Sequence, residues 1–336
     1  MAPGRDLLFA MTSEGHRFPI LDLTHDAFKV SRDPQFLERL LREYVAADRR
    51  QRRVPAVVQK WLMRTMARRS PLMKALIHPD SDHFDGLSTY VIKLGDKNLP
   101  SPFDGRLEKR IAGSPHALLT RVRMQQIAGM MATAVRSDPH LWGPRTLHLL
   151  NIAGGPAFDS INALLMLAED EPALLDRRIE IEVLDLAGPG AAFGQAAIEQ
   201  LTRPGAPLAG VDVVFRHIPY DWNDTRPLRD RLEAIRAEGG IALLSSEGGL
   251  FEYANDAAVS ANLELLGQFG DIVRNVFGSV TVDEETVATD YFTLQRRGLS
   301  GFQPIAAAAG WELASWNGSG LSHQVCLRRS SAPDAH

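Results

Sequence analysis

The feature that most constrains the fold is an apolar run that ends abruptly in small residues. Leu147–Ile152 is mostly apolar, and Ala153–Ala157 then reads Ala, Gly, Gly, Pro, Ala before a helical pattern begins near Asp159 and Ser160. This order predicts a buried strand, a tight loop and a helix. Small side chains in such a loop allow a nucleotide-like ligand to lie against bare backbone N–H groups.

A second apolar strand is expected at Ile179–Leu186, with Asp185 near its end. In a doubly wound sheet, a carboxylate at this place can accept hydrogen bonds from both hydroxyls of a ribose. The two segments together predict an adenosine-type ligand in a doubly wound α/β domain.

Three kinds of ligand loop compete for this sequence. A dinucleotide fingerprint that starts with Ala153 and Gly155 puts its third glycine place on Phe158, which is too large for close helix packing. A phosphate-binding P-loop needs Lys followed by Ser or Thr, and the loop has neither. The interpretation that remains is a loop that holds an adenosyl group without phosphates.

In this loop the chain resembles the class I S-adenosylmethionine (SAM)-dependent methyltransferases. The first motif of that family is acidic-x-Gly-x-Gly-x-Gly after strand one. Asn151 takes the acidic place here, Ala153, Gly155 and Ala157 take the glycine places, and Gly154 lies between the first two. The resemblance implies that SAM lies over Ala153–Ala157.

The same resemblance assigns the other cofactor contacts to the ends of the following strands. Asp185 and Leu186 are expected at the ribose and beside it. Asp221, at the end of a strand expected over Val211–Asp221, and its neighbour Trp222 are expected at the adenine. Ser246 ends a strand expected over Ile241–Ser246 and is expected at the edge of the active site.

The last third of the chain predicts the rest of the sheet. A strand–turn–strand closes an otherwise alternating series, which indicates an antiparallel pair. We therefore expect a Rossmann-like, seven-stranded methyltransferase sheet with an antiparallel terminal strand in residues 144–330, followed by a short tail, 331–336. The further elements are strands over Asp271–Val280, Glu312–Trp316 and His323–Arg328, and helices over Ala257–Gln268 and Phe302–Trp311.

Residues 1–143 are expected to form a separate, mostly helical region. Apolar residues recur at helical spacing in four segments, and one short strand is expected at Thr89–Leu94. In small-molecule methyltransferases such a region caps the active site, selects the substrate or forms the dimer, so the resemblance implies a small organic substrate and is compatible with a homodimer. The four helical segments are Asp33–Val45, Val54–Ala67, Pro71–Ile77 and Pro115–Val135.

Charge is divided unevenly along the chain. Residues 1–150 hold 24 Lys and Arg against 15 Asp and Glu, which leaves 13 against 26 for the rest. The basic half includes Arg49, Arg50, Arg52 and Arg53, but the whole chain has a net charge of −4 and no nucleic-acid recognition module is evident, so we expect no nucleic-acid partner. No apolar run approaches the roughly 20 residues needed to span a bilayer, so no membrane partner and a cytoplasmic location are expected.

Three residues are candidates for catalytic work. Glu247 follows the fourth strand, where its carboxylate can act as a base, hold the substrate or bind backbone N–H groups of its glycine turn. Tyr253 lies a few residues on and can cover SAM or the acceptor, or pack in the core. His323 begins the last strand and offers an imidazole for general-base catalysis, with an edge-strand histidine as the alternative.

One cluster of potential metal ligands remains a separate possibility, although no metal is expected. His and Asp are dense in the segment after Ile77, but this segment contains Pro and Ser and is expected to be a loop, where Asp and Ser also form turns. Its members are His78, Asp80, Asp82, His83 and Asp85.

The sequence thus predicts a SAM-dependent methyltransferase for a small organic acceptor, in which O- or N-methylation in specialised metabolism is favoured. Two alternatives stay open: a methyltransferase fold that binds SAM but catalyses a reaction other than methyl transfer, and a non-catalytic partner subunit.

Overall fold

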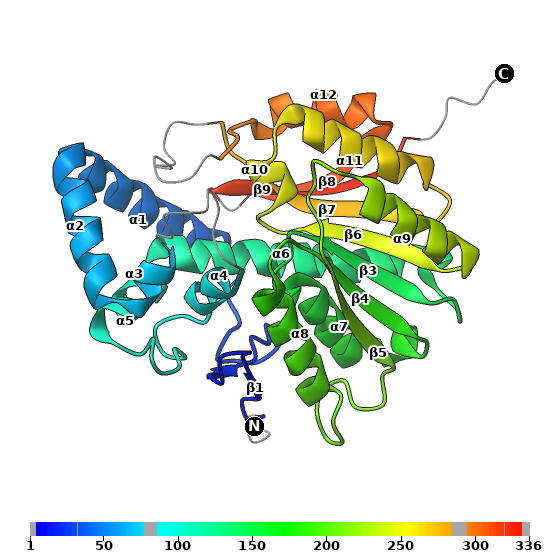
Figure 1. Cartoon of the computed structure of the whole chain (residues 1–336), viewed down its shortest axis with the longest axis horizontal. Coiled ribbons are helices and arrows are strands. Elements are labelled where there is room, and N and C mark those ends of the chain that lie inside the picture. The colour runs from blue at the N-terminus through cyan, green and yellow to red at the C-terminus, as the bar shows by residue number, and fades with distance from the viewer. Residues whose placement is uncertain (1–4, 32, 77–85, 284–293, 319, 331–336) are drawn as a thin grey trace.

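The computed structural model describes residues 5–31, 33–76, 86–283, 294–318 and 320–330 (Figure 1). Its helices are α1 (Pro34–Arg52), α2 (Ala56–Arg69), α3 (Pro71–Leu76), α4 (Gly86–Lys93), α5 (Arg106–Ala112), α6 (Pro115–Ser137), α7 (Phe158–Asp170), α8 (Gly188–Leu201), α9 (Arg226–Ala237), α10 (Leu250–Tyr253), α11 (Asp256–Gln268) and α12 (Gly298–Ala308). Its strands are β1 (Phe9–Met11), β2 (Arg17–Pro19), β3 (Leu147–Ile152), β4 (Ile179–Leu184), β5 (Val213–Ile218), β6 (Ile241–Ser246), β7 (Val273–Thr281), β8 (Trp311–Gly318) and β9 (Ser322–Arg329).

The main sheet has the order β5-β4-β3-β6-β7-β9-β8. Strands β3 to β7 run parallel to one another, whereas β9 is antiparallel to both β7 and β8. The order reverses at β3, from which β4 and β6 extend to opposite sides, and ligands of open α/β sheets bind at such a switch point. The predicted seven-stranded sheet with an antiparallel terminal strand is confirmed.

Helices cover both faces of this sheet (Figure 1). On one face, alternate residues of the parallel strands, such as Leu149 and Ile181, pack with α6, α7 and α8 in a first core. On the other face, the intervening residues, such as Leu150 and Leu244, pack with α9, α11 and α12 in a second core. The strands are buried on both faces because parallel crossovers place helices on each side.

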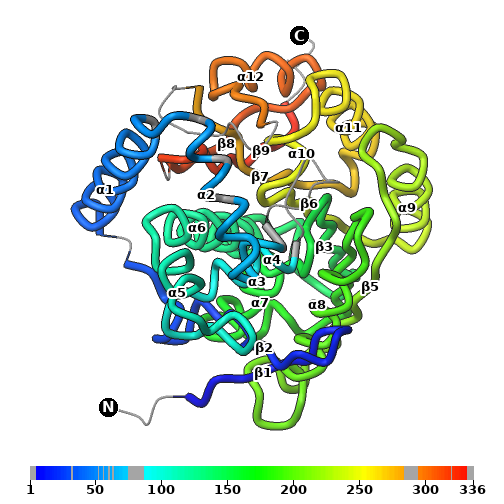
Figure 2. The backbone as a smooth tube through the Cα atoms, turned by 60° about the vertical axis from the view of Figure 1, so that its left-hand side comes forward, coloured from blue at the N-terminus to red at the C-terminus, as the bar shows by residue number. Residues whose placement is uncertain are grey.

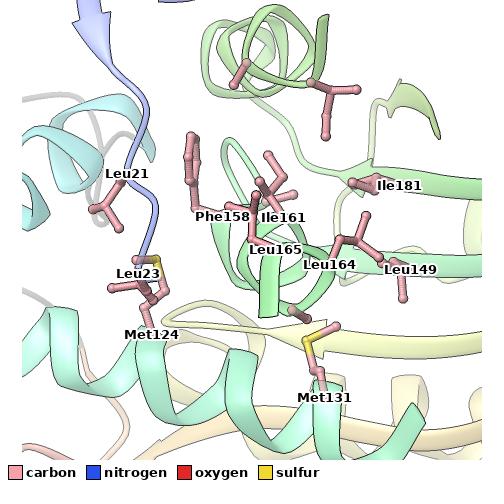
Figure 3. Close-up of a cluster of buried hydrophobic side chains, with 14 of the residues drawn as sticks. Leu21, Leu23, Met124, Met131, Leu149, Phe158, Ile161, Leu164, Leu165 and Ile181 are labelled. Atoms are coloured by element: carbon pink, nitrogen blue, oxygen red, sulfur yellow. The ribbon is translucent and has the colours of Figure 1, made fainter. Parts of the chain in front are cut away.

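The chain before α1 connects the N-terminal region to the sheet. The hairpin of β1 and β2 lies against α8 (Figure 2). Leu21 and Leu23 then pass beside Phe158 of α7 and Met124 of α6 (Figure 3). Residues from both parts of the chain therefore share one core. The predicted division at residue 143 stays a prediction.

The strand predicted at Thr89–Leu94 is wrong, because this segment lies in helix α4 and the turn after it. Its β-branched residues favour a strand locally, but tertiary packing overrides that preference. The helix buries Tyr90 beside Phe158 and Phe193. It also lets the Tyr90 hydroxyl accept a hydrogen bond from Leu21 N, at 2.9 Å, and donate one to a backbone carbonyl of β2.

Candidate functional site

In the loop between β3 and α7, called here the 153–157 loop, every second residue has a left-handed backbone conformation. Ala153, Gly155 and Ala157 have φ angles of 52°, 51° and 54°, all in the left-handed region. These are the three positions that the methyltransferase motif gives to glycine, the residue that adopts this region without steric cost. Each alanine there costs roughly 1–2 kcal/mol. The backbone is therefore left-handed at all three positions, although alanine stands in place of glycine at two of them.

Gly154 is needed in the same loop for a different reason. A Cβ at this position would lie 2.6 Å from Cβ of Asn151, closer than any real contact of this kind. Asn151 is fully buried at the end of β3, where its side chain accepts a hydrogen bond from Ser160 Oγ at 2.9 Å and donates one to Leu149 O. Asn151 therefore joins the strand to the first turn of α7.

Asp185 lies beside the loop, as the sequence predicts. Its two carboxylate oxygens accept hydrogen bonds from Gly155 N at 3.0 Å and Ala187 N at 2.9 Å. Each oxygen of a carboxylate can accept a second bond, so the group keeps capacity for ligand hydroxyls. Leu186, the next residue, exposes 66% of its surface. The parallel pairing of β3 with β4 thus brings the loop and Asp185 together at one edge.

The predicted adenine contacts lie at the same edge, one strand further out. Tyr220 N donates a weak hydrogen bond to Asp185 O at 3.3 Å, which places the residues after β5 beside the end of β4. Asp221 is exposed and accepts two bonds from Asn223 in a local turn. Trp222 is half-buried against the second core. The structure therefore brings these two residues to the edge that holds Asp185.

Ser246 connects two strand ends. Its hydroxyl donates a hydrogen bond to Ile152 O at 3.0 Å and accepts one from Leu250 N at 2.8 Å. Since the side chain is fully buried and both contacts are internal, it couples the 153–157 loop to the segment after β6. A Cβ at Gly249 would lie 2.7 Å from Cβ of Ala153, so the two segments also touch directly.

Glu247 opens the segment after β6, called here the 247–249 loop. Its carboxylate forms an ion pair with Lys93 and one with Arg123, the latter at 2.6 Å. Burial alone would raise the pKa of Glu247, but the two cations outweigh it and hold the pKa below its usual range. A carboxylate that is occupied on both oxygens and kept ionised is a poor proton acceptor. The geometry therefore favours a structural role among the alternatives open for Glu247.

The ion pairs extend from the 247–249 loop into α10. Arg123 also binds both carboxylate oxygens of Glu252, at 3.1 and 3.2 Å. Gly248 has a φ of 73°, and a Cβ there would lie 2.5 Å from the Arg123 guanidinium. Two cations from the N-terminal region thus meet two anions from the sheet domain in a network of balanced charge, in which each side chain is at most 11% exposed.

This network includes residues that the sequence did not single out. Lys93 ends α4, and Arg123 lies within α6, whose apolar spacing it interrupts. Asp159 is buried near the network, where it accepts hydrogen bonds from Ser160 N and Ser245 Oγ. Burial raises the pKa of Asp159. Lys93 and Arg123, as charged residues within helices that also carry apolar side chains, were the available signal, but Glu247 lies 154 and 124 positions away from them.

The other two catalytic candidates lie at the same edge of the sheet. Tyr253 ends α10 next to Glu252, is half-buried, and has a pKa that burial raises above its usual value. His323 lies in β9 opposite Val280 near the end of β7, with its ring 5.3 Å from that of Trp316. Between β3 and β9 lie β6 and β7, so His323 is roughly 14 Å from the end of β3 at the usual strand spacing.

The cluster of potential metal ligands, at which no metal was expected, lies outside the described residues; its members are His78, Asp80, Asp82, His83 and Asp85. Within the described ranges, one group has metal-ligand spacing: His148, Glu180 and Glu182, all buried. The guanidinium of Arg231 binds both of these carboxylates, so the position is taken by an internal cation. Within the described ranges, no helix combines the length and the apolar composition of a membrane span.

Comparison with known proteins gives likenesses of structure. Neither family models nor curated proteins match the sequence. A solved structure of a possible exported protein from Bordetella parapertussis is similar over 90% of this chain and 100% of that chain, with 17% identity and a TM-score of 0.52.

Two solved methyltransferases are similar at lower scores. Magnesium protoporphyrin IX methyltransferase from Synechocystis PCC 6803 has 12% identity and a TM-score of 0.41, over 64% of this chain and 87% of that one. A riboflavin-derivative dimethyltransferase from Streptomyces davawensis has 14% identity and a TM-score of 0.37, over 77% and 70%. The order and direction of the seven strands show that the chain has the class I methyltransferase fold.

Proposed function

We propose that this chain binds SAM over the 153–157 loop and transfers its methyl group to a small organic acceptor. The observation that carries the proposal is the left-handed backbone at residues 153, 155 and 157, next to the carboxylate of Asp185. A loop with this backbone presents amides without bulky side chains, and the neighbouring carboxylate suits the vicinal hydroxyls of a ribose.

The residues at this edge fit the parts of an adenosyl ligand. Asp185 would hold the ribose through the free acceptor capacity of its two oxygens, Leu186 would cover the sugar or base, and Asp221 with Trp222 would hold the adenine. The half-buried Ala153 and Gly154 leave the loop open on one side.

When bound, SAM would supply an electrophilic methyl group for an acceptor O or N, with S-adenosylhomocysteine as the co-product. The protein has to align the acceptor, exclude water and receive a proton where the acceptor carries one. The buried ion pairs of Glu247 with Lys93 and Arg123 would hold the acceptor side of the site in place. Tyr253 and His323 remain the candidates for handling the proton.

Calorimetry of the full chain with SAM and with S-adenosylhomocysteine tests the cofactor part. We expect both to bind with micromolar affinity. If neither binds more tightly than millimolar, the proposal fails at the cofactor and a non-catalytic subunit becomes the better account.

A labelled-methyl experiment tests the transfer. The chain is incubated with methyl-labelled SAM and a small-molecule extract, and products are sought by mass spectrometry. We expect one labelled class of small molecules. SAM that binds and is recovered unchanged, while an extract component is isomerised or cyclised, would instead support the alternative of a reaction other than methyl transfer.

A further inference from the structure

Helix α2 exposes a row of large apolar side chains. Val57, Val58, Trp61 and Leu62 lie at spacings that place them on one side of the helix, and Val57 and Trp61 expose 80% and 65% of their surface. Within the described ranges, half of the strongly exposed large apolar residues lie on this helix of 14 residues. A concentration of this kind marks an interaction site more often than a chance surface.

The orientation of α2 is fixed by its opposite side. Met66 and Ala67 pack against the first core, and α2 contacts α3. Together with α1, α2 projects from the body of the molecule, away from the sheet (Figures 1 and 2). The apolar row therefore faces outward because the helix already uses its other side for packing.

The same helix and the end of α1 are strongly basic. Residues 49–69 contain eight Arg and Lys and no Asp or Glu. Arg64, Arg68 and Arg69 of α2 are exposed. The surface made of these three arginines and the four apolar residues is called here the α2 face. A partner that covers it must accept apolar side chains and supply negative charge.

We propose that the α2 face binds the surface of a bilayer that contains anionic lipid. An amphipathic helix lies in the plane of such an interface with its apolar residues among the acyl chains and its Lys and Arg at the anionic headgroups. Trp61, with an apolar ring and an N–H donor, suits the boundary between the two. A helix of this length lies on a membrane and does not span it. The sequence predicted no membrane partner because it lacks a spanning run, and the proposal departs from that prediction because surface binding needs no such run.

Two other partners fit the α2 face less well. A two-fold contact between two copies of α2 would place its arginines opposite one another, with no acidic residue in 49–69 to balance them. Nucleic acid would satisfy the arginines, but it recognises proteins through charge and aromatic stacking, and three of the four apolar residues are aliphatic.

Vesicle co-sedimentation of the full chain tests the proposal. One set of vesicles is phosphatidylcholine alone, and the other contains about one third phosphatidylserine. We expect binding to the second set, weakened by raised salt, with a blue shift of tryptophan fluorescence that Trp61→Ser removes. Equal sedimentation with both sets, or none, would overturn the proposal.

Paired variants show whether the α2 face is responsible. Trp61→Ser is expected to weaken vesicle binding about five- to ten-fold, whereas Trp316→Ser, at a tryptophan of β8 that is 52% exposed, should leave it unchanged. Arg64→Gln with Arg68→Gln should weaken binding about 25-fold. The matched pair Arg203→Gln with Arg226→Gln, both exposed in the acidic half, should have little effect.

Two further outcomes would assign the α2 face to another partner. If light scattering shows a dimer that Trp61→Ser converts to a monomer, the occupant is a second copy of this chain. If duplex or single-stranded RNA binds as tightly as the anionic vesicles and competes with them, the occupant is nucleic acid. Either result overturns the proposal, and neither depends on whether SAM binds.

Discussion

The 153–157 loop and the 247–249 loop lie side by side, but different interactions hold them in place. The first depends on small residues and on three left-handed backbone positions. The second depends on charged side chains of α4 and α6. Lys93 and Arg123 bind Glu247, although they lie 154 and 124 residues away from it in the sequence. The comparison shows that a cofactor loop can be encoded locally while the facing loop is positioned by the N-terminal region.

The largest expected effect is a loss of stability when the buried ion pairs of the 247–249 loop are broken. Arg123→Met leaves Glu247 and Glu252 buried without this cation, which should lower the free energy of unfolding by about 3–5 kcal/mol. Arg226→Met, at an exposed ion pair with Asp224, should lower it far less, because solvent screens an exposed pair. Urea unfolding measures both. Similar losses in the two variants would show that the buried network does not hold the 247–249 loop.

The next largest effect should be on SAM affinity alone. Asp185→Asn keeps the shape of the side chain but removes its charge, and loss of charged hydrogen bonds of about 1.5–3 kcal/mol should weaken SAM binding about 10- to 100-fold. Asp224→Asn, near the same edge, serves as the control. Calorimetry measures the affinity, and an unchanged value for Asp185→Asn would show that the ribose lies elsewhere.

A smaller effect tests the strain in the 153–157 loop. Ala153→Gly and Ala157→Gly each relieve a left-handed alanine, partly offset by the greater freedom of glycine in the unfolded chain. We expect a gain of about 0.5–1 kcal/mol for each in thermal unfolding, and Ala153→Val should destabilise. Two glycine variants that both lower stability would contradict the left-handed geometry.

The smallest expected effect concerns pH and the 247–249 loop. The pKa of Glu247 is lower in the folded protein than in the unfolded chain, so its contribution to stability is present above the ordinary glutamate pKa of about 4.3 and is lost as pH falls below it. The stability difference between the wild-type chain and Glu247→Gln should therefore shrink on acidification. A difference that stays constant from about pH 7 to 3.5 would show that the pKa is not lowered.

Much of the fold was predictable because its signals are local. The strands that end at Ile152 and Ser246 are short apolar runs bounded by small residues, and the closing strand–turn–strand indicated the antiparallel pair. The segment around Tyr90 was not predictable in this way. Its β-branched neighbours favour a strand, whereas the observed helix buries the Tyr90 ring against Phe158 and Phe193, which are distant in the sequence.

In the candidate site too, the locally encoded residues were predictable and the long-range contacts were not. Ala153–Ala157 and Asp185 could be named from the sequence because small residues and strand-end carboxylates are visible in it. The partners of Glu247 could not, since nothing in the spacing of α4 and α6 indicates which carboxylate their cations will meet.

The sequence by itself determined the alternation of strands and helices and the small-residue bend at the switch point, because hydrophobic period and steric freedom are properties of neighbouring residues. Only the tertiary structure decided that Arg123 joins Glu247 and Glu252, and that α2 keeps its apolar row outward. These depend on which distant surfaces meet. The energy of a buried charge or an exposed apolar side chain is set by what lies against it.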